Sequence, residues 1–194
     1  MIGITGSIGA GKSLVGAILR ERKIRVIDAD VAVHHLYRDN QELRSAIAAG
    51  FGADMLTEKG ISRGRMAELV FKDPSARLRL ESLVYPVLTD YLLRANPAFV
   101  EAALFENVPK LVERLDEIWV VTASEDVRLK RLMEKRGFSE KDARCRIELQ
   151  RSRDSEEYWQ QLFPGKMLRF IDNTLDEDHL RTQIEDILKS SSPC

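Results

Sequence analysis

The stretch GITGSIGAGKSLVG, residues 3–16, carries the pattern that decides the fold. Within it, residues 6–13 match the pattern GxxxxGK followed by Ser or Thr, between an apolar run typical of a strand and a run with helical patterning. Glycines let backbone N–H groups converge on phosphate oxygens, and the helix that follows adds the positive end of its dipole. The stretch therefore predicts a P-loop, which binds a nucleoside triphosphate.

Two side chains of this loop carry specific chemistry. Lys12 is expected to reach the β- and γ-phosphates of ATP, and the Ser13 hydroxyl is expected to bind Mg²⁺, which prefers oxygen ligands. A glycine-rich turn without a ligand would explain the glycines but would leave Lys12 and Ser13 unexplained. We therefore predict ATP and Mg²⁺ as cofactors, with Lys12 as a catalytic residue and Ser13 as the metal ligand.

Short runs rich in β-branched residues recur along the chain, with helical patterns between most of them. This alternation predicts an α/β fold with a five-stranded parallel sheet, the three-layer fold of P-loop NTPases. Trp119 is expected to pack in the core. The predicted strands are residues 2–5, 24–28, 99–104, 117–122 and 168–172.

Three helix starts can be predicted from capping residues. Ser139 precedes Asp142 at the spacing of a cap, and another helix is expected to begin near Ser124. Thr174 and Glu177 have the spacing of a capping box before a last helix. Four apolar residues fall on one face of that helix, namely Leu180, Ile184, Ile187 and Leu188.

The spacing of the strands predicts how the chain is divided. About 70 residues separate the second and third predicted strands, whereas a parallel crossover needs only a dozen or more. Residues 31–97 are therefore expected to form a helical lobe that binds the second substrate, the acceptor of the phosphoryl group; we call it the acceptor lobe. Within it, Pro86 should interrupt or kink a helix that starts near Pro74. Residues 126–163 are expected to form a helical lid, and the nucleotide core comprises residues 1–30, 98–125 and 164–194.

Composition favours an ordinary cytoplasmic protein. The formal net charge is −1 with 31% charged residues, which disfavours nucleic acid or an anionic membrane as a partner. No apolar run approaches the roughly 18 residues of a membrane span, and the N-terminus lacks the basic region of a secretory signal. Cys145 and Cys194 form no CxxC pair, which is typical of a reducing compartment.

The sequence also indicates what happens to the nucleotide. Neither DxxG nor NKxD, the signatures of signalling GTPases, occurs in the chain. Asp28 and Asp30 instead follow the second predicted strand, at the rim where open α/β sheets bind ligands. In extended chain these two carboxylates point the same way, so one could take a proton from an acceptor hydroxyl. The alternative is that they cap the helix that begins near Val31.

Several segments resemble the dephospho-CoA kinase family in order and approximate spacing. The resemblance implies ATP-dependent phosphorylation of the ribose 3′-hydroxyl of dephospho-coenzyme A, the last step of coenzyme A biosynthesis. It spans nearly the whole chain. The segments are GITGSIGAGKS at 3–13, VIDAD at 26–30, RMAELVFKDP at 65–74, RLESLVYP at 79–86, ALFEN at 103–107, RLKRLMEKRGFSEKDARCRIELQ at 128–150 and FIDN at 170–173.

The resemblance also implies roles for individual residues. Asp30 corresponds to the catalytic base, and Arg63 and Glu106 correspond to residues near the acceptor. In the lid, Arg128, Arg131 and Lys135 share one helical face, and Arg136 and Arg144 are expected to contact the phosphates; a solvated helix face is the alternative. The predicted ATP-binding residues are Gly9, Ala10, Gly11, Lys12, Ser13, Leu14, Arg136 and Arg144.

The chain departs from the family pattern at a few positions. Tyr85 stands where histidine is usual, and Lys135-Arg136 stands where arginine followed by aspartate is common, so either basic residue could take the arginine's role. Two rival functions stay open: another small-molecule kinase, acting on a nucleoside monophosphate or a sugar, and a nucleotide-dependent switch ATPase. The expected oligomeric state is a monomer or a weak homo-oligomer.

Overall fold

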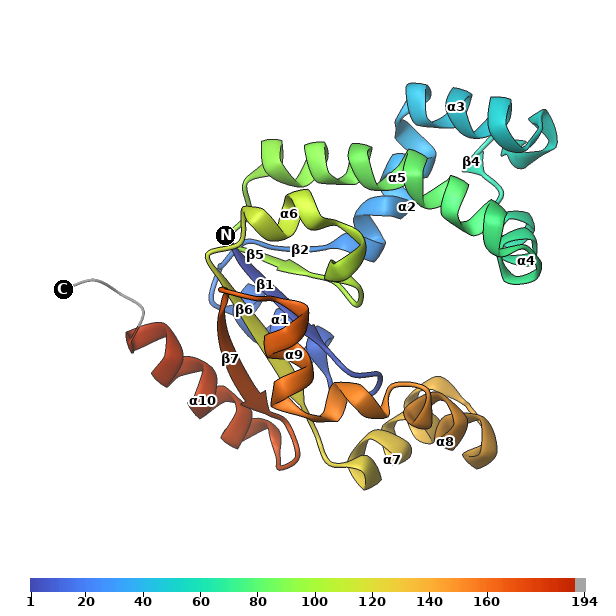
Figure 1. Ribbon diagram of the computed structural model, residues 1–194. Helices are drawn as coiled ribbons and strands as arrows, with labels where there is room; N and C mark the ends of the chain where they lie inside the picture. Colours follow the sequence, from blue (N-terminus) through green and yellow to red (C-terminus); the bar gives the residue numbers. More distant parts are fainter. Residues whose placement is uncertain (191–194) are drawn as a thin grey trace. The chain divides into compact units, whose positions relative to one another are not determined.

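The computed structural model describes residues 1–190 (Figure 1). These residues form two compact units. The first unit contains residues 1–26, 98–104 and the chain from residue 114 onward, and the second unit contains residues 27–97 and 105–113. The division of the chain into core, lobe and lid by function stays a prediction.

The sheet has the predicted five strands, in the order β2-β5-β1-β6-β7. Strand β1 pairs in parallel with β5 and with β6, and β6 pairs in parallel with β7. The third strand, predicted over residues 99–104, ends early, at Glu101. The strands are β1 (Ile2–Gly6), β2 (Val26–Asp28), β5 (Phe99–Glu101), β6 (Glu117–Thr122) and β7 (Met167–Asp172).

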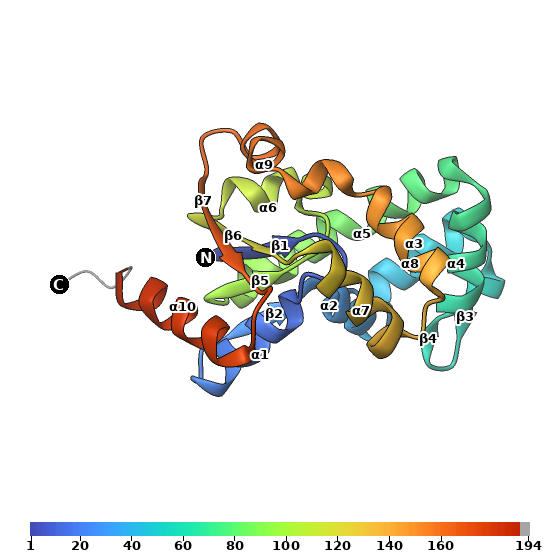
Figure 2. The same cartoon turned by 90° about the horizontal axis from the view of Figure 1, so that it is seen from below.

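Helices cover both faces of this sheet. In Figure 2, α1 (Lys12–Glu21) and α10 (Glu177–Ser190) lie on one side of the sheet, and α9 (Glu156–Leu162) lies on the other. The core beneath α1 and α10 contains Trp119, which is fully buried, as predicted. Its ring meets the Phe99 ring edge-on, with 4.8 Å between centroids. These layers confirm the three-layer fold.

The predicted apolar face of the last helix is confirmed, but its predicted cap is wrong. Leu180 and Ile184 are fully buried, and Ile187 and Leu188 pack against the same core. The cap is Asp176, whose Oδ1 accepts from the His179 N–H at 2.9 Å. Thr174 instead turns its hydroxyl away from α10, toward the backbone N–H of Ser124 and the Asp172 carboxylate, so the helix starts later than the Thr174–Glu177 capping box predicts.

Two helices and a short 3-10 turn follow β6. Helix α7 (Glu125–Arg136) begins directly after Ser124, as predicted, and packs against α8 (Glu140–Glu148). The predicted Ser139 cap is confirmed, because its Oγ accepts from the Asp142 N–H at 3.1 Å. The turn η3 (Arg151–Asp154) then leads into α9. A small apolar core joins α7 and α8 and contains Leu129, Leu132, Ala143 and Ile147.

The second unit is mainly helical. Its longest helix, α5 (Pro74–Ala95), contacts α2, α3 and α4. Pro74 occupies the first turn of α5, where no N–H is needed, and Pro86 lies inside the helix without interrupting it. The other elements of the unit are α2 (Ala29–Asp39), α3 (Gln41–Phe51), η1 (Ala53–Met55), β3 (Leu56–Thr57), β4 (Gly60–Ile61), α4 (Arg63–Lys72), η2 (Phe105–Asn107) and α6 (Pro109–Glu113).

Two expectations from the sequence, about membrane spans and about cysteine pairing, concern the cell compartment of the protein. Among residues 1–190, no helix has both the length and the apolar character needed to cross a membrane. The Cys145 thiol is exposed and not in a disulfide, and Cys194 lies outside the described residues.

Candidate active site

The predicted P-loop connects β1 to α1 in the first unit. Gly11 is the N-cap of α1, with φ of 100°, and it offers no side chain to the amides of the first helical turn. A Cβ on this residue would lie 2.1 Å from Nδ2 of Asn173, so only glycine fits here. A helix that begins with uncapped amides and a positive dipole end is an anion-binding site.

The Lys12 side chain folds along the inside of this loop. Its Nζ donates to the Gly6 carbonyl at 2.8 Å and lies 3.4 Å from the Ser7 carbonyl oxygen. These contacts hold the ammonium group over the loop instead of in solvent. A cation in this place can neutralise the charge of a bound polyphosphate.

Ser13 has a partner that the sequence did not indicate. Its Oγ donates to Oε1 of Glu101 at 2.8 Å, and Glu101, the last residue of β5, is only 5% exposed. Arg20 lies near the same carboxylate, with 4.0 Å between Nη2 and Oε2. The sequence indicated Ser13 alone as a metal ligand, and the family resemblance placed Glu106, five residues further on, near the acceptor. The predicted strand ran on to residue 104 and so placed Glu101 inside the strand, which hid its position at the carboxyl end of β5.

The donor set at this position fits Mg²⁺. A hydroxyl and a carboxylate supply oxygen ligands, and Mg²⁺ usually takes one or two protein ligands and completes its shell with phosphates and water. Within residues 1–190, no group of three or more His, Cys, Asp or Glu side chains could hold a metal ion by itself. The residues therefore suit a metal that arrives with a nucleotide.

A cavity of about 210 Å³ opens beside the loop in the first unit. Of the predicted ATP-binding residues, all line it except Ala10 and Arg144. Ala10 is fully buried beneath the loop. The remaining lining residues are Arg131, Leu132, Lys135 and Asn173.

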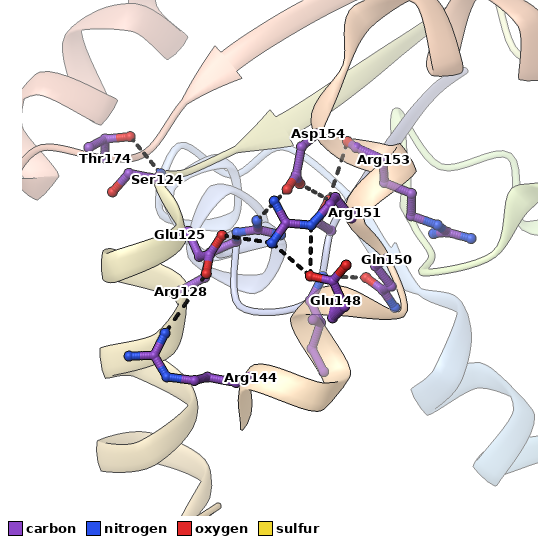
Figure 3. A network of polar contacts seen from close by, with 12 residues as sticks. Ser124, Glu125, Arg128, Arg144, Glu148, Gln150, Arg151, Arg153, Asp154 and Thr174 are labelled. Carbon is purple, nitrogen blue, oxygen red and sulfur yellow. Dashed lines mark hydrogen bonds and ion pairs between the residues drawn. The ribbon is translucent and has the colours of Figure 1, made fainter. Parts of the chain in front are cut away.

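Arg144 makes ion pairs on the surface of α8. Its Nη2 lies 2.8 Å from Oε1 of Glu140, and its Nη1 lies 4.0 Å from Oε1 of Glu125 (Figure 3). The contact between Arg144 and nucleotide stays a prediction.

Arg131 and Asn173 hold the second half of the loop. Arg131 Nη1 donates to the Ala10 carbonyl at 3.1 Å, and its Nη2 donates to the Asn173 carbonyl at 2.9 Å. Asn173 Nδ2 also donates to the Ala10 carbonyl, at 2.7 Å. Burial lowers the pKa of Arg131, but a guanidinium stays charged at neutral pH. Asn173, at the end of FIDN, was not among the predicted site residues, because its role depends on contact with a loop 163 residues earlier.

The two candidate acids of the second unit differ in their surroundings. The prediction that both lie on extended chain is wrong, because the chain turns helical at Ala29. Asp28 is the N-cap of α2, and its Oδ1 accepts from the Val31 N–H at 3.1 Å, which confirms the capping alternative for this residue. Asp30 lies in the first helical turn and is exposed.

The predicted acceptor residues lie on separate short segments of the second unit. Arg63 is the first residue of α4 and is exposed, and Glu106 lies in η2, half-buried. Tyr85 Oη accepts from Asn107 Nδ2 at 3.2 Å. Burial, with a smaller contribution from nearby Tyr85, raises the pKa of Tyr37 to about 12, and Arg63 opposes this shift. Tyr37 thus interacts electrostatically with Tyr85 and Arg63.

Comparison with known proteins relates this arrangement to a family. A family model described as dephospho-CoA kinase matches residues 1–162. The chain is 35% identical over 164 residues to the dephospho-CoA kinase of Listeria monocytogenes, covering 80% of this chain and 82% of that protein.

Two solved structures resemble the fold over nearly its full length. A protein from Thermus thermophilus has a TM-score of 0.72 and 27% identity, with 99% of this chain and 97% of that chain covered. A dephospho-CoA kinase from Campylobacter jejuni has a TM-score of 0.67 and 25% identity, with 97% and 95% covered.

Proposed function

The chain belongs to the dephospho-CoA kinase family, and from this premise we propose how its residues carry out the reaction. The activity is ATP-dependent phosphorylation of dephospho-coenzyme A, the final step of coenzyme A biosynthesis. The observation that carries the assignment of roles is the loop at the start of α1, where the helix has no side-chain cap and Gly11, Lys12 and Ser13 line one cavity.

The first unit binds the nucleotide in this proposal. The amides at the start of α1 and the Lys12 ammonium bind the β- and γ-phosphates of ATP. Arg131, Lys135 and Arg136 line the same cavity and supply positive charge for the remaining phosphate oxygens. The sequence left open whether Lys135 or Arg136 takes the role of the family's lid arginine. Both residues line the cavity.

Ser13 and Glu101 hold Mg²⁺ in this proposal, Ser13 through its hydroxyl and Glu101 directly or through a water. When bound there, Mg²⁺ would neutralise part of the charge that develops on the transferring phosphoryl group. Arg20, whose Nη2 lies 4.0 Å from Oε2 of Glu101, adds positive charge beside this carboxylate. Removal of Mg²⁺ should abolish transfer.

The transfer step uses an acid of the second unit. Asp30 accepts the proton of the ribose 3′-hydroxyl while that oxygen bonds to the γ-phosphorus. The bond from the γ-phosphorus to its bridging oxygen breaks, and ADP leaves with the charge that Lys12 neutralises. Arg63, Glu106 and the Tyr37–Tyr85 pair bind the acceptor. Most of the rate comes from positioning and charge stabilisation.

A coupled assay of ADP release tests the function. Dephospho-coenzyme A should support turnover far above AMP, a sugar or no acceptor, and mass spectrometry should find one added phosphate on the product. Equal turnover with a nucleoside monophosphate would favour another small-molecule kinase, and ADP release that ignores the acceptor would favour a switch ATPase. We expect a monomer or weak homo-oligomer in the cytoplasm, which sedimentation and cell fractionation can test.

A further inference from the structure

The first half of the P-loop, Ser7–Gly9, is tied to residues that follow α7 in the chain. The Ile8 N–H donates to Oε1 of Gln150 at 2.8 Å. Ser7 Oγ lies 3.4 Å from both Oδ1 of Asp154 and the Arg153 carbonyl oxygen. Gly9 touches α7 directly, because a Cβ on it would lie 3.1 Å from the Cβ and the carbonyl oxygen of Arg128. Each residue of Ser7–Gly9 therefore has a neighbour between residues 128 and 154.

A buried charge lies behind these contacts. Arg128 is 2% exposed, and its Nη2 donates to Oδ2 of Asp154 at 2.7 Å (Figure 3). Its Nε and Nη1 are also buried and lack a hydrogen-bond partner among the described residues. A buried guanidinium with two unsatisfied nitrogens is costly, and an apolar side chain would often be at least as stable. Stability alone does not account for this arginine.

A bound anion does not account for Arg128 either. A second cavity, of about 200 Å³, is lined by Ser7, Arg128 and Arg153, but also by the carboxylates of Glu125 and Asp154. Two carboxylates disfavour an anion there, and the two unsatisfied nitrogens are shielded from solvent. The role that remains for Arg128 is to hold the loop in place through Asp154, because Asp154 contacts both Arg128 and Ser7.

We propose that Arg128, Gln150 and Asp154 are positioning residues of the nucleotide site. They fix Ser7–Gly9 so that the loop has its phosphate-binding shape before ATP arrives. Gln150 accepts from the Ile8 amide, and the Ser7 carbonyl accepts from the Ala10 N–H at 3.2 Å. These two hydrogen bonds fix the orientation of two backbone groups of the loop. This inference rests on the proposed role of the loop in binding ATP.

Gln150 and Arg128 test the inference with a matched control. Gln150→Met keeps the shape but removes the acceptor of the Ile8 amide, and Arg128→Gln removes the buried charge. Arg169→Gln is the control, because Arg169 pairs with the buried Glu117 in the same unit, away from the loop. We expect Arg128→Gln and Arg169→Gln both to lower Tm, whereas only Gln150→Met and Arg128→Gln weaken ATP binding, by about three- to tenfold.

Asp154 supplies a conservative rescue. Asp154→Asn keeps an oxygen that accepts from Arg128, so its ATP affinity should lie closer to wild type than that of Asp154→Ala. ATP affinity is measured by calorimetric titration, and the KM values of ATP and dephospho-coenzyme A are measured below the Tm of every variant. The acceptor KM should stay within about twofold of wild type, since one lost hydrogen bond of the loop does not touch the acceptor.

The outcomes separate this inference from the proposed function. ATP affinities of Gln150→Met and Arg128→Gln within twofold of wild type would overturn the positioning role, as would an equal loss in Arg169→Gln. Wild-type protein that binds ATP but does not phosphorylate dephospho-coenzyme A would overturn the function and leave the titration of the loop variants valid.

Discussion

The two units of the molecule differ in where they keep their polar side chains. The buried polar and charged side chains of the described chain all belong to the first unit, except Thr89. In the second unit, by contrast, Asp30 and Arg63 are exposed. The first unit thus holds the loop beside a buried polar network, whereas the proposed base Asp30 and the proposed acceptor residue Arg63 lie at the surface of the second unit and Glu106 is half-buried. We expect substitutions in the first unit to change nucleotide binding and those in the second to change transfer or acceptor binding.

The largest effect should come from the loop lysine. Lys12→Ala removes the cation that neutralises the phosphates, and kcat/KM with ATP should fall by about a thousandfold. Circular dichroism and Tm should stay near wild type, because Lys12 is only half-buried. A Lys12→Ala enzyme that retains most of its activity would break the assignment of nucleotide binding to the first unit.

Asp30→Asn is the corresponding test for the second unit. Asparagine keeps the size of the side chain but cannot take a proton, so kcat should fall by about a hundred- to ten-thousandfold. ATP affinity by titration should not change. Asp28→Asn serves as the control, since asparagine also caps a helix. Near-normal turnover in Asp30→Asn would remove the base assignment.

Arg131 and Arg144 both belong to the first unit, and we expect them to contribute differently to ATP binding. Arg131→Ala removes donors to the Ala10 carbonyl and to Asn173, and we expect the KM of ATP to rise about tenfold. Arg144→Ala should change it by about twofold or less, because Arg144 must leave Glu140 and Glu125 to reach a phosphate. A larger effect of Arg144→Ala would support the predicted contact between Arg144 and the nucleotide.

The smallest effect concerns stability at alkaline pH. The pKa of Tyr37 is raised to about 12 by burial, so the folded state keeps the phenol proton more tightly than the unfolded state does. Stability from this group is present below about pH 10 and is lost as pH rises from 10 to 12. Tyr37→Phe should reduce this loss by about 1–2 kcal/mol, after discounting for partial exposure, in urea titrations at pH 8 and pH 11.5. An unchanged pH dependence would contradict the assignment.

Local patterns were sufficient to predict the elements of the fold. The P-loop, the five strands, the Ser139 cap and the apolar face of α10 each depend on residues close together in sequence. Where two local signals competed, the sequence reading was wrong. Asp28 caps α2 and ends the extended chain before Asp30, and Asp176 caps α10 in place of Thr174.

The supports of the site could not be predicted because they join distant segments. Ser13 meets Glu101 across 88 residues, Ile8 meets Gln150 across 142, and Asn173 meets Ala10 across 163. Periodicity identified Arg128 and Arg131 as sharing a helical face. It did not distinguish the buried Arg128 from the surface Arg144, because burial depends on which segment packs against the face.

Helix α1 begins at Lys12, after an N-cap glycine that offers no side chain, and in the proposed binding mode a phosphate of ATP caps it. Nucleotide then acts as a structural part as well as a reactant: a hundredfold excess over its Kd would add about 2.7 kcal/mol to the folded state. In a cell with little ATP, a larger fraction of the protein would be unfolded and open to proteolysis. The lifetime of the protein would then depend on the supply of its own substrate.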